Sequence, residues 1–367
     1  MMSSAARKGD GGSLVANWNE VICMKMPRGA SICLVVACFI TAFAQQPTPA
    51  NRRITLDVVV TDKHGDPVTG LNQQDFTLLD NKGPQKILGF QPVTGPATDP
   101  PVSVILLVDE ANASFSSVAT ERDQLEKFFR QDGGALAVPV SIDFLTDSGL
   151  EVGNDASKDG NAMAAELVQR QTALRTIRRS QGFYGAEDRV GLSLQAIARL
   201  ADTEAPKPGR KLVVWVSPGW PLLSNPNVQY TEKNRQQIFG TIVAVSDELR
   251  QARITLDAVD PLGTSDAVGF QTTAYKAYLK GVKKQGQAEV ANLALQVIAS
   301  QSGGMVLNSS NDIAGEIAKC VRDASAFYEI SFDGLPGDGP NEYHALEVKI
   351  DKPGLTARTR AGYYAQP

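Results

Sequence analysis

The chain has 367 residues, of which 36 are Lys or Arg and 40 are Asp or Glu, and its formal net charge is −4. A hydrophobic content of 43% is typical of a globular protein rather than a disordered one, and the length leaves room for two or three domains. The slight negative charge argues against nucleic acid or an anionic membrane as the main partner. Two His and four Cys are too few for a disulfide scaffold or for zinc clusters built from Cys and His.

The amino-terminal segment has the pattern of a secretory signal. Residues 32–44 (ICLVVACFITAFA) are almost wholly apolar, and Lys25 and Arg28 precede them. Ala42 and Ala44 place small residues at the two positions that a signal peptidase reads, so we expect cleavage after Ala44. The apolar run is too short to serve as a permanent membrane span.

Two alternatives concern how this segment begins and is processed. Residues 1–23 lack the signal pattern, and Met24 or Met26 is an alternative start that would make the upstream residues an over-extended reading frame. Residues 35–38 (VVAC) resemble a bacterial lipobox, in which Cys38 would carry a lipid. A lipid anchor would tether the protein to a membrane instead of leaving it free after export.

The expected mature chain has 323 residues and a single cysteine. The removed stretch carries four basic and two acidic residues, so the mature net charge is −6. Cys320 is the only remaining thiol, which excludes an internal disulfide, and its helical spacing with Ile317 and Ala324 predicts a buried position. We expect an exported protein without a transmembrane helix in its mature chain, located in the periplasm, at the cell surface or outside the cell.

The first part of the mature chain predicts β-structure. Residues 45–51 are a polar, Pro-containing leader that we expect to be flexible, and alternating β-branched residues follow. A hairpin turn is expected at residues 80–83. A stretch rich in Pro, Thr and Gly then marks a boundary, so this flank covers residues 52–92 and a linker covers residues 93–101. The predicted strands are residues 54–62, 76–79 and 85–90.

The middle of the chain, residues 102–326, predicts an α/β domain. Nearly continuous apolar runs, typical of strands buried on both faces, alternate with segments of helical periodicity. Strands that alternate with helices require crossover connections, which predicts a doubly wound, mostly parallel sheet. The predicted strands are residues 102–108, 138–145, 211–216, 254–259 and 305–307. The predicted helices are residues 115–129, 162–177, 189–201, 228–250, 288–300 and 312–326.

The last part of the chain, residues 327–367, returns to β-structure. Its predicted strands are residues 327–332, 344–350 and 355–360. Each flank then has roughly three strands, which is too few to cover a hydrophobic face. We therefore predict that the two flanks pair into one β-sandwich, with the α/β domain inserted between them.

Several segments resemble one protein family. They are residues 58–90 (VVVTDKHGDPVTGLNQQDFTLLDNKGPQKILGF), 258–263 (AVDPLG), 302–305 (SGGM) with 311–312 (ND), and 344–365 (HALEVKIDKPGLTARTRAGYYA). These segments are similar to the VWFA-related domain proteins of acidobacteria, and the resemblance covers nearly the whole mature chain. Its most specific part is the ending at residues 360–364 (RAGYY). The resemblance implies a von Willebrand factor A-like fold, export and a binding role such as adhesion.

The resemblance also implies where a metal ion would bind. Domains similar to von Willebrand A hold Mg²⁺ with an Asp-x-Ser-x-Ser pattern after the first strand, together with a Thr and an Asp from later loops. Asp109 fits the first ligand, but Ala111 and Ala113 stand at the two Ser positions, and the loop starting at Ser217 lacks the Asp. We therefore expect a lost metal site and no cofactor, with Asp109 accepting backbone N–H groups of its turn. Retained Mg²⁺ binding at Asp109 is the alternative.

The carboxyl ends of the parallel strands are the expected place for a ligand, because open α/β sheets bind ligands there. Two readings of Trp220 stay open: it is either an exposed anchor for a partner or packed under its own loop. The side chains expected to form this ligand-binding crevice are Asp109, Asn112, Ser114, Ser217 and Trp220.

The sequence lacks the patterns of the common catalytic sites. His64 and His344, the two histidines, lie in the β flanks, and there is no Gly-x-Ser-x-Gly nucleophile elbow and no phosphate-binding loop of the Walker type. We therefore expect an exported, non-catalytic interaction module whose partner is a protein or a cell-envelope ligand. The alternatives are a metal-dependent adhesion domain, a structural component of the envelope, and an enzyme that uses the crevice.

Overall fold

The computed structural model describes residues 52–95, 102–113, 115–171, 183–220, 230–262 and 274–367. The expected signal segment, the leader at residues 45–51, Ser114 and most of the linker therefore lie outside the described residues. Residues 172–177, the end of one predicted helix, lie outside them as well.

A seven-stranded sheet forms the centre of the α/β part, in the order β11-β10-β9-β5-β6-β7, with β8 also paired to β6. Its pairs are parallel except that β7 and β8 run antiparallel to β6. The predicted mostly parallel sheet is confirmed. The strands are β5 (Ser103–Asp109), β6 (Ala135–Thr146), β7 (Gly149–Glu151), β8 (Ser157–Asp159), β9 (Lys211–Val216), β10 (Ile254–Val259) and β11 (Val306–Leu307).

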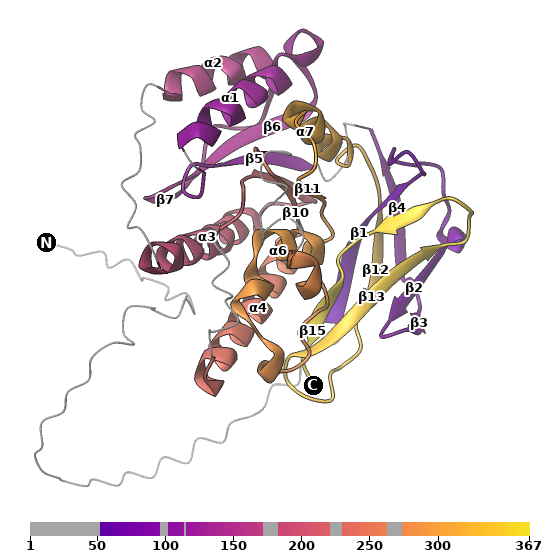
Figure 1. Cartoon of the computed structure of the whole chain (residues 1–367). Coiled ribbons are helices and arrows are strands. Elements are labelled where there is room, and N and C mark those ends of the chain that lie inside the picture. The colour runs from indigo at the N-terminus through magenta and orange to yellow at the C-terminus, as the bar shows by residue number, and fades with distance from the viewer. Residues whose placement is uncertain (1–51, 96–101, 114, 172–182, 221–229, 263–273) are drawn as a thin grey trace, which may run out of the picture. The chain divides into compact units, whose positions relative to one another are not determined.

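Helices cover both faces of this sheet (Figure 1). Successive strand residues point to opposite faces, so Leu106 joins the core beneath α1, α2 and α7, while Leu107 joins the core beneath α3, α4 and α6. Burial on both faces explains why these strands have continuous apolar sequences. The helices are α1 (Phe115–Phe129), α2 (Gly160–Gln171), α3 (Phe183–Glu204), α4 (Glu232–Gln251), α6 (Leu295–Ser302) and α7 (Ile313–Arg322).

Two antiparallel four-stranded sheets form a β-sandwich, in the orders β14-β1-β12-β4 and β15-β13-β2-β3. β1 from the first flank pairs with β12 from the tail, and β2 pairs with β13, so each sheet contains both flanks. Side chains such as Leu56, Leu78 and Ile330 fill the space between the sheets. The predicted sandwich is confirmed. Its strands are β1 (Arg53–Thr61), β2 (Phe76–Asp80), β3 (Gly83–Gln85), β4 (Gly89–Thr94), β12 (Ala326–Asp333), β13 (Glu342–Ile350), β14 (Thr356–Arg358) and β15 (Gly362–Ala365).

The structure corrects the third predicted strand, residues 85–90. β3 ends at Gln85 after pairing with β2, and β4 starts at Gly89 in the other sheet, where it pairs with β12. The intervening residues carry the chain across the sandwich, with Ile87 buried in its core. β4 then continues to Thr94, two residues into the expected linker.

The structure also corrects two predicted elements near the end of the chain. The predicted helix 288–300 starts late, because Ala294 is extended (ψ 146°) and separates α6 from the 3₁₀ turn η8 (Val290–Leu293). The predicted strand 355–360 is shorter and is followed by β15, which the sequence analysis missed. β15 pairs with β13 and completes the second sheet.

Arg253 joins the α/β part to the sandwich. It lies in the turn between α4 and β10, and its Nη2 is 2.5 Å from Asp57 Oδ1 and 2.7 Å from Glu329 Oε2. Asp57 and Glu329 are direct register partners on β1 and β12. Like charges opposite each other destabilise an antiparallel pair, so Arg253 neutralises a repulsion inside the sandwich sheet while it fixes that sheet to the α/β part.

Replacement of Arg253 by Met should lower the free energy of unfolding by about 3 kcal/mol, because two partly buried carboxylates would lose their cation. Urea denaturation of the mature chain measures this. The triple variant Arg253→Met, Asp57→Asn, Glu329→Gln should recover much of the loss, since the repulsion is then absent. A triple variant no more stable than the single one would contradict this role for Arg253.

Candidate functional site

Asp109, the last residue of β5, is fully buried and surrounded by hydrogen-bond donors. The backbone N of Asn112 donates to Oδ1 at 2.8 Å. Three side chains donate to Oδ2: Asn112 Nδ2 at 2.9 Å, Ser217 Oγ at 2.6 Å and Trp215 Nε1 at 3.3 Å. The carboxyl group thus accepts one backbone N–H of its own turn, and its other donors are side chains from that turn and from the end of β9.

The donors around Asp109 are themselves held by other elements. Ser217 Oγ accepts from the backbone N of Gly219 at 2.9 Å, so its hydroxyl hydrogen points to Asp109. Asn112 Nδ2 also lies 3.0 Å from Ser193 Oγ, which comes from α3. We call the surface around Asp109, Asn112 and Ser217 the carboxyl edge, since β5 and β9 end there.

The structure brings three of the five expected site residues together: Asp109, Asn112 and Ser217. Ser114 lies outside the described residues. Trp220 is only 2% exposed, and its Nε1 donates to the backbone O of Leu293 at 2.9 Å. Its ring lies 5.6 Å from that of Trp215. The exposed-anchor reading of Trp220 is therefore wrong, because both its ring and its N–H are used inside the molecule.

Carboxyl groups near this edge are shifted toward their protonated forms. Burial raises the pKa of Asp109, although the hydrogen bonds from Ser217 and Asn112 act in the opposite direction. Burial also raises the pKa of Glu110 to about 7 against the effect of the Arg170 guanidinium. On α1, burial raises the pKa of Glu121 well above its ordinary value, and the charges of Asp109 and Glu110 raise it further.

The residues at the carboxyl edge do not fit a divalent-cation site. Asp109 gives its oxygens to four internal hydrogen bonds, and the buried side chains of Ala111 and Ala113 offer no oxygen. Across the described ranges, no three His, Cys, Asp or Glu side chains gather in a way that could hold a metal ion. A hard cation needs an octahedron of oxygen ligands, which these side chains do not supply.

The sequence analysis missed two networks. The sequence predicted Trp215 only as part of a buried strand. A buried indole N–H needs an acceptor, and here that acceptor is Asp109. In the sandwich, His344 Nδ1 lies 2.8 Å from Asp80 Oδ1, and Tyr363 donates to Asp80 Oδ2 at 2.6 Å. All three are buried, so this group links β2, β13 and β15 inside the sandwich rather than facing solvent.

No family model and no curated protein sequence matches this chain. Among solved structures, a point mutant of the PilB minor pilin from Streptococcus sanguinis is similar, with 9% identity, a TM-score of 0.34, and coverage of 73% of this chain and 78% of that one. The pilus adhesin SpaC from Lactobacillus rhamnosus GG is also similar, with 10% identity and a TM-score of 0.36. That match covers 83% of this chain and 43% of SpaC.

Replacement of Asp109 by Ala should lower the free energy of unfolding by about 3 kcal/mol, because several buried donors would lose their acceptor. Ser217→Ala removes one donor and should cost about 1 kcal/mol. The exposed Asp66, changed to Ala, is the control and should change stability by less than about 0.5 kcal/mol. Denaturant unfolding of the three variants measures the order, and an Asp109→Ala protein as stable as the control would exclude a structural role.

A second buried carboxyl, Asp257, lies within β10 away from the carboxyl edge. Its Oδ1 accepts from the backbone N of Met305 at 2.6 Å, and the Cys320 thiol is a further hydrogen-bonding neighbour of this carboxyl. Burial raises the pKa of Asp257 to about 6 against the effect of the Arg358 guanidinium. The folded state thus binds this proton more tightly than the unfolded state does.

The Asp257 carboxyl should therefore stabilise the fold fully below pH 3.8 and lose this contribution as the pH rises through about 6. Asp257→Asn cannot titrate, so the stability difference between wild type and this variant should favour wild type most at pH 4 and shrink by about 2–3 kcal/mol toward pH 7. Urea unfolding at both pH values tests the sign, and a difference independent of pH would contradict it.

Proposed function

We propose that this chain is an exported, non-catalytic binding protein of the VWFA-related class, which recognises a protein or an envelope ligand at its carboxyl edge without a metal ion. Residues 1–44 would be removed on export, and the mature chain would act in the periplasm, at the cell surface or outside the cell. The proposed parts are a sandwich of residues 52–92 and 327–367, a linker of residues 93–101 and a von Willebrand A-like domain of residues 102–326.

The burial and internal hydrogen bonding of Asp109 are the observation that carries this proposal. A carboxylate that acts as a metal ligand or a general base must face its target. Here Asp109 is fully buried, and its oxygens accept hydrogen bonds from Asn112, Ser217 and Trp215, which supports a structural role. The buried position of His344 against Asp80 gives no support to a catalytic histidine either.

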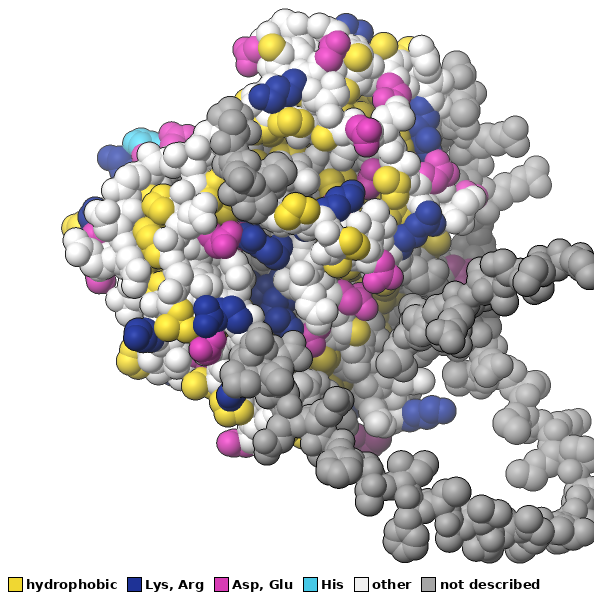
Figure 2. All heavy atoms as spheres, turned by 180° about the vertical axis from the view of Figure 1, so that it is seen from behind, with side chains coloured by type: hydrophobic (Ala, Val, Ile, Leu, Met, Phe, Trp, Pro, Cys, Tyr) yellow, Lys and Arg dark blue, Asp and Glu magenta, His cyan; other side chains and the backbone are white. Residues whose placement is uncertain are grey.

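The described surface favours recognition by mixed contacts. Figure 2 shows the molecule from behind, and on the described part of that face hydrophobic side chains are scattered among charged and polar ones. Among the described residues, the exposed large hydrophobic side chains are spread over α2 and three separate connecting segments: Leu88, Val152, Val168 and Leu335. No helix within the described residues is long and apolar enough to cross a membrane. Interfaces of non-obligate complexes are about as apolar as ordinary surface, so this surface is compatible with a reversible partner.

A variant of Pro218, which follows β9 at the carboxyl edge, tests the proposal. The mature chain, immobilised on a resin in a buffer that contains EDTA, should retain a specific partner from the envelope fraction of the source bacterium. Pro218→Arg should abolish retention, because it places a bulky cation on the proposed contact surface. Pro208→Arg is the matched control, since exposed Pro208 precedes the same strand at the opposite end of the sheet.

Calorimetric titration with Mg²⁺ and Mn²⁺ completes this experiment. The proposal expects no saturable heat and equal partner retention in EDTA and in Mg²⁺. Saturable metal binding that Asp109→Ala abolishes would establish the metal-dependent alternative instead. Equal retention by the Pro218→Arg and Pro208→Arg proteins would place the contact elsewhere and overturn the carboxyl-edge proposal.

A further inference from the structure

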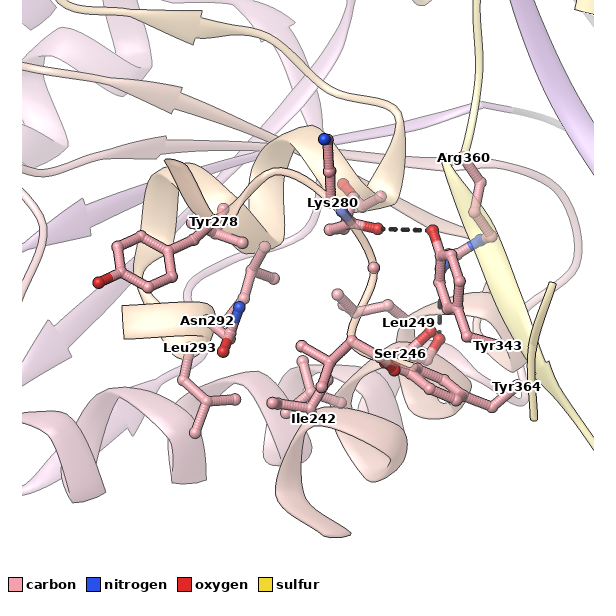
Figure 3. Close-up of a pocket in the computed structure, with 17 residues that line it drawn as sticks. Ile242, Ser246, Leu249, Tyr278, Lys280, Asn292, Leu293, Tyr343, Arg360 and Tyr364 are labelled. Atoms are coloured by element: carbon pink, nitrogen blue, oxygen red, sulfur yellow. Dashed lines mark hydrogen bonds between the residues drawn. The ribbon is translucent and has the colours of Figure 1, made fainter. Parts of the chain in front are cut away.

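A cavity lies where the tail strands pack on the α/β part, and its lining includes none of Asp109, Asn112 and Ser217 (Figure 3). Its walls come from α4, α6, the segment that follows η6 (Tyr275–Tyr278), and the strands β13 and β15. Figure 3 shows Tyr278 and Asn292 on one side and Tyr343, Tyr364 and Arg360 on the other. We call this cavity the tail pocket.

The tail pocket has apolar walls. Ile242 and Leu249 from α4 and Leu293 from η8 supply aliphatic surface. The hydroxyl of Tyr343 donates to Gln301 Oε1 at 3.2 Å, and that of Tyr364 donates to the backbone O of Val282 at 3.1 Å. Because both hydroxyls are bound by the protein, these two residues offer the pocket mainly their rings.

Arg360 places a buried positive charge in this otherwise mainly apolar wall. The residue is 8% exposed, and its Nη1 donates to the backbone O of Ser246 at 3.2 Å. The two acidic residues that act on it, Asp247 and Asp57, form their ion pairs with Arg250 and Arg253 instead. Burial lowers the pKa of Arg360 to about 10, and the charge of Arg250 lowers it further against the effect of the two acids.

A buried cation without an anionic partner is costly, since the interior cannot replace its hydration. A planar guanidinium is well suited to bind a carboxylate through two parallel hydrogen bonds. Lys280, the other basic residue of the lining, points away from the open centre in Figure 3. Arg360 is therefore the lining residue whose charge an anionic ligand in the pocket would pair with.

The dimensions limit the size of an occupant. The space between the lining atoms is about 480 Å³ with its mouth included, and about 40 Å³ of it can hold the centre of a water molecule. One water needs roughly 10–15 Å³ of such space, so the pocket as a whole has room for about three. An occupant must therefore be small, with a polar head at Arg360 and a short apolar body.

We propose that the tail pocket binds a small apolar monocarboxylate, whose carboxylate pairs with Arg360 and whose hydrocarbon part lies between α4, α6 and the rings of Tyr343 and Tyr364. The pocket exists only where the sandwich and the α/β part meet, so such an acid would bind both parts at once. This site is separate from the carboxyl edge, and its occupant would bind equally in EDTA.

Titration of the mature chain with benzoate and hexanoate, followed by NMR, tests this proposal. At least one acid should bind saturably, and its neutral amide, benzamide or hexanamide, should bind at least about tenfold more weakly. Absence of saturable binding of both acids up to about 10 mM, or equal binding of acid and amide, would overturn the proposal.

Two variants locate the site. Ile242→Trp should fill part of the pocket and weaken binding at least about tenfold, whereas Ala244→Trp, at an exposed position on the same helix, should change it less than about twofold. Arg360→Gln should weaken acid binding to the level of the amide. If Arg360→Gln does not fold, the acid–amide comparison and the two Trp variants decide, and unchanged binding by Ile242→Trp overturns the proposal.

Discussion

The pairing of the two chain ends is the constraint on which the rest of this structure depends. β1 pairs with β12 and β2 pairs with β13, so neither sheet of the sandwich is complete without both flanks. Closing so long a loop costs entropy, but this cost grows only with the logarithm of loop length. The ends of the inserted α/β part are close, because β4 before it pairs with β12 after it, with Thr94 opposite Ala326. A large domain can therefore be inserted in the chain between two strands of the sandwich, and the entropy cost of closing the chain is little more than that of a short loop.

The short strand β15 shows how one segment serves several parts of the fold. Successive residues of a strand point to opposite faces. Tyr363 thus points into the sandwich, where it donates to Asp80, and Tyr364 points outward to Phe239 of α4, with ring centroids 5.9 Å apart. Arg360, just before this strand, reaches the backbone of α4. The alternation within residues 360–364 (RAGYY) thus serves both the interior of the sandwich and the contact with α4.

Periodicity and composition predicted the fold well where one interaction decides the structure. β9 and β10 have the predicted bounds because strands buried on both faces need unbroken apolar runs. Prediction failed where tertiary contacts compete with local pattern. The crossing between β3 and β4 depends on a partner strand far along the chain, and the late start of α6 depends on one extended residue, Ala294.

At the candidate site, the sequence identified Asp109 but not its donor Trp215, because strand register alone places that indole beside the carboxylate.

The two arginine sites show that burial alone does not determine what a charged side chain does. Arg253 is held between two carboxylates that would repel each other without it, so its charge stabilises the sandwich sheet. Arg360 reaches only a backbone carbonyl, and the nearby acids are engaged by other arginines. Asp109 resembles Arg253 in this respect, because groups inside the fold bind both of its oxygens. Within the described residues, a charge already satisfied by the fold therefore indicates a structural role, and the incompletely paired Arg360 indicates a place for an external anion.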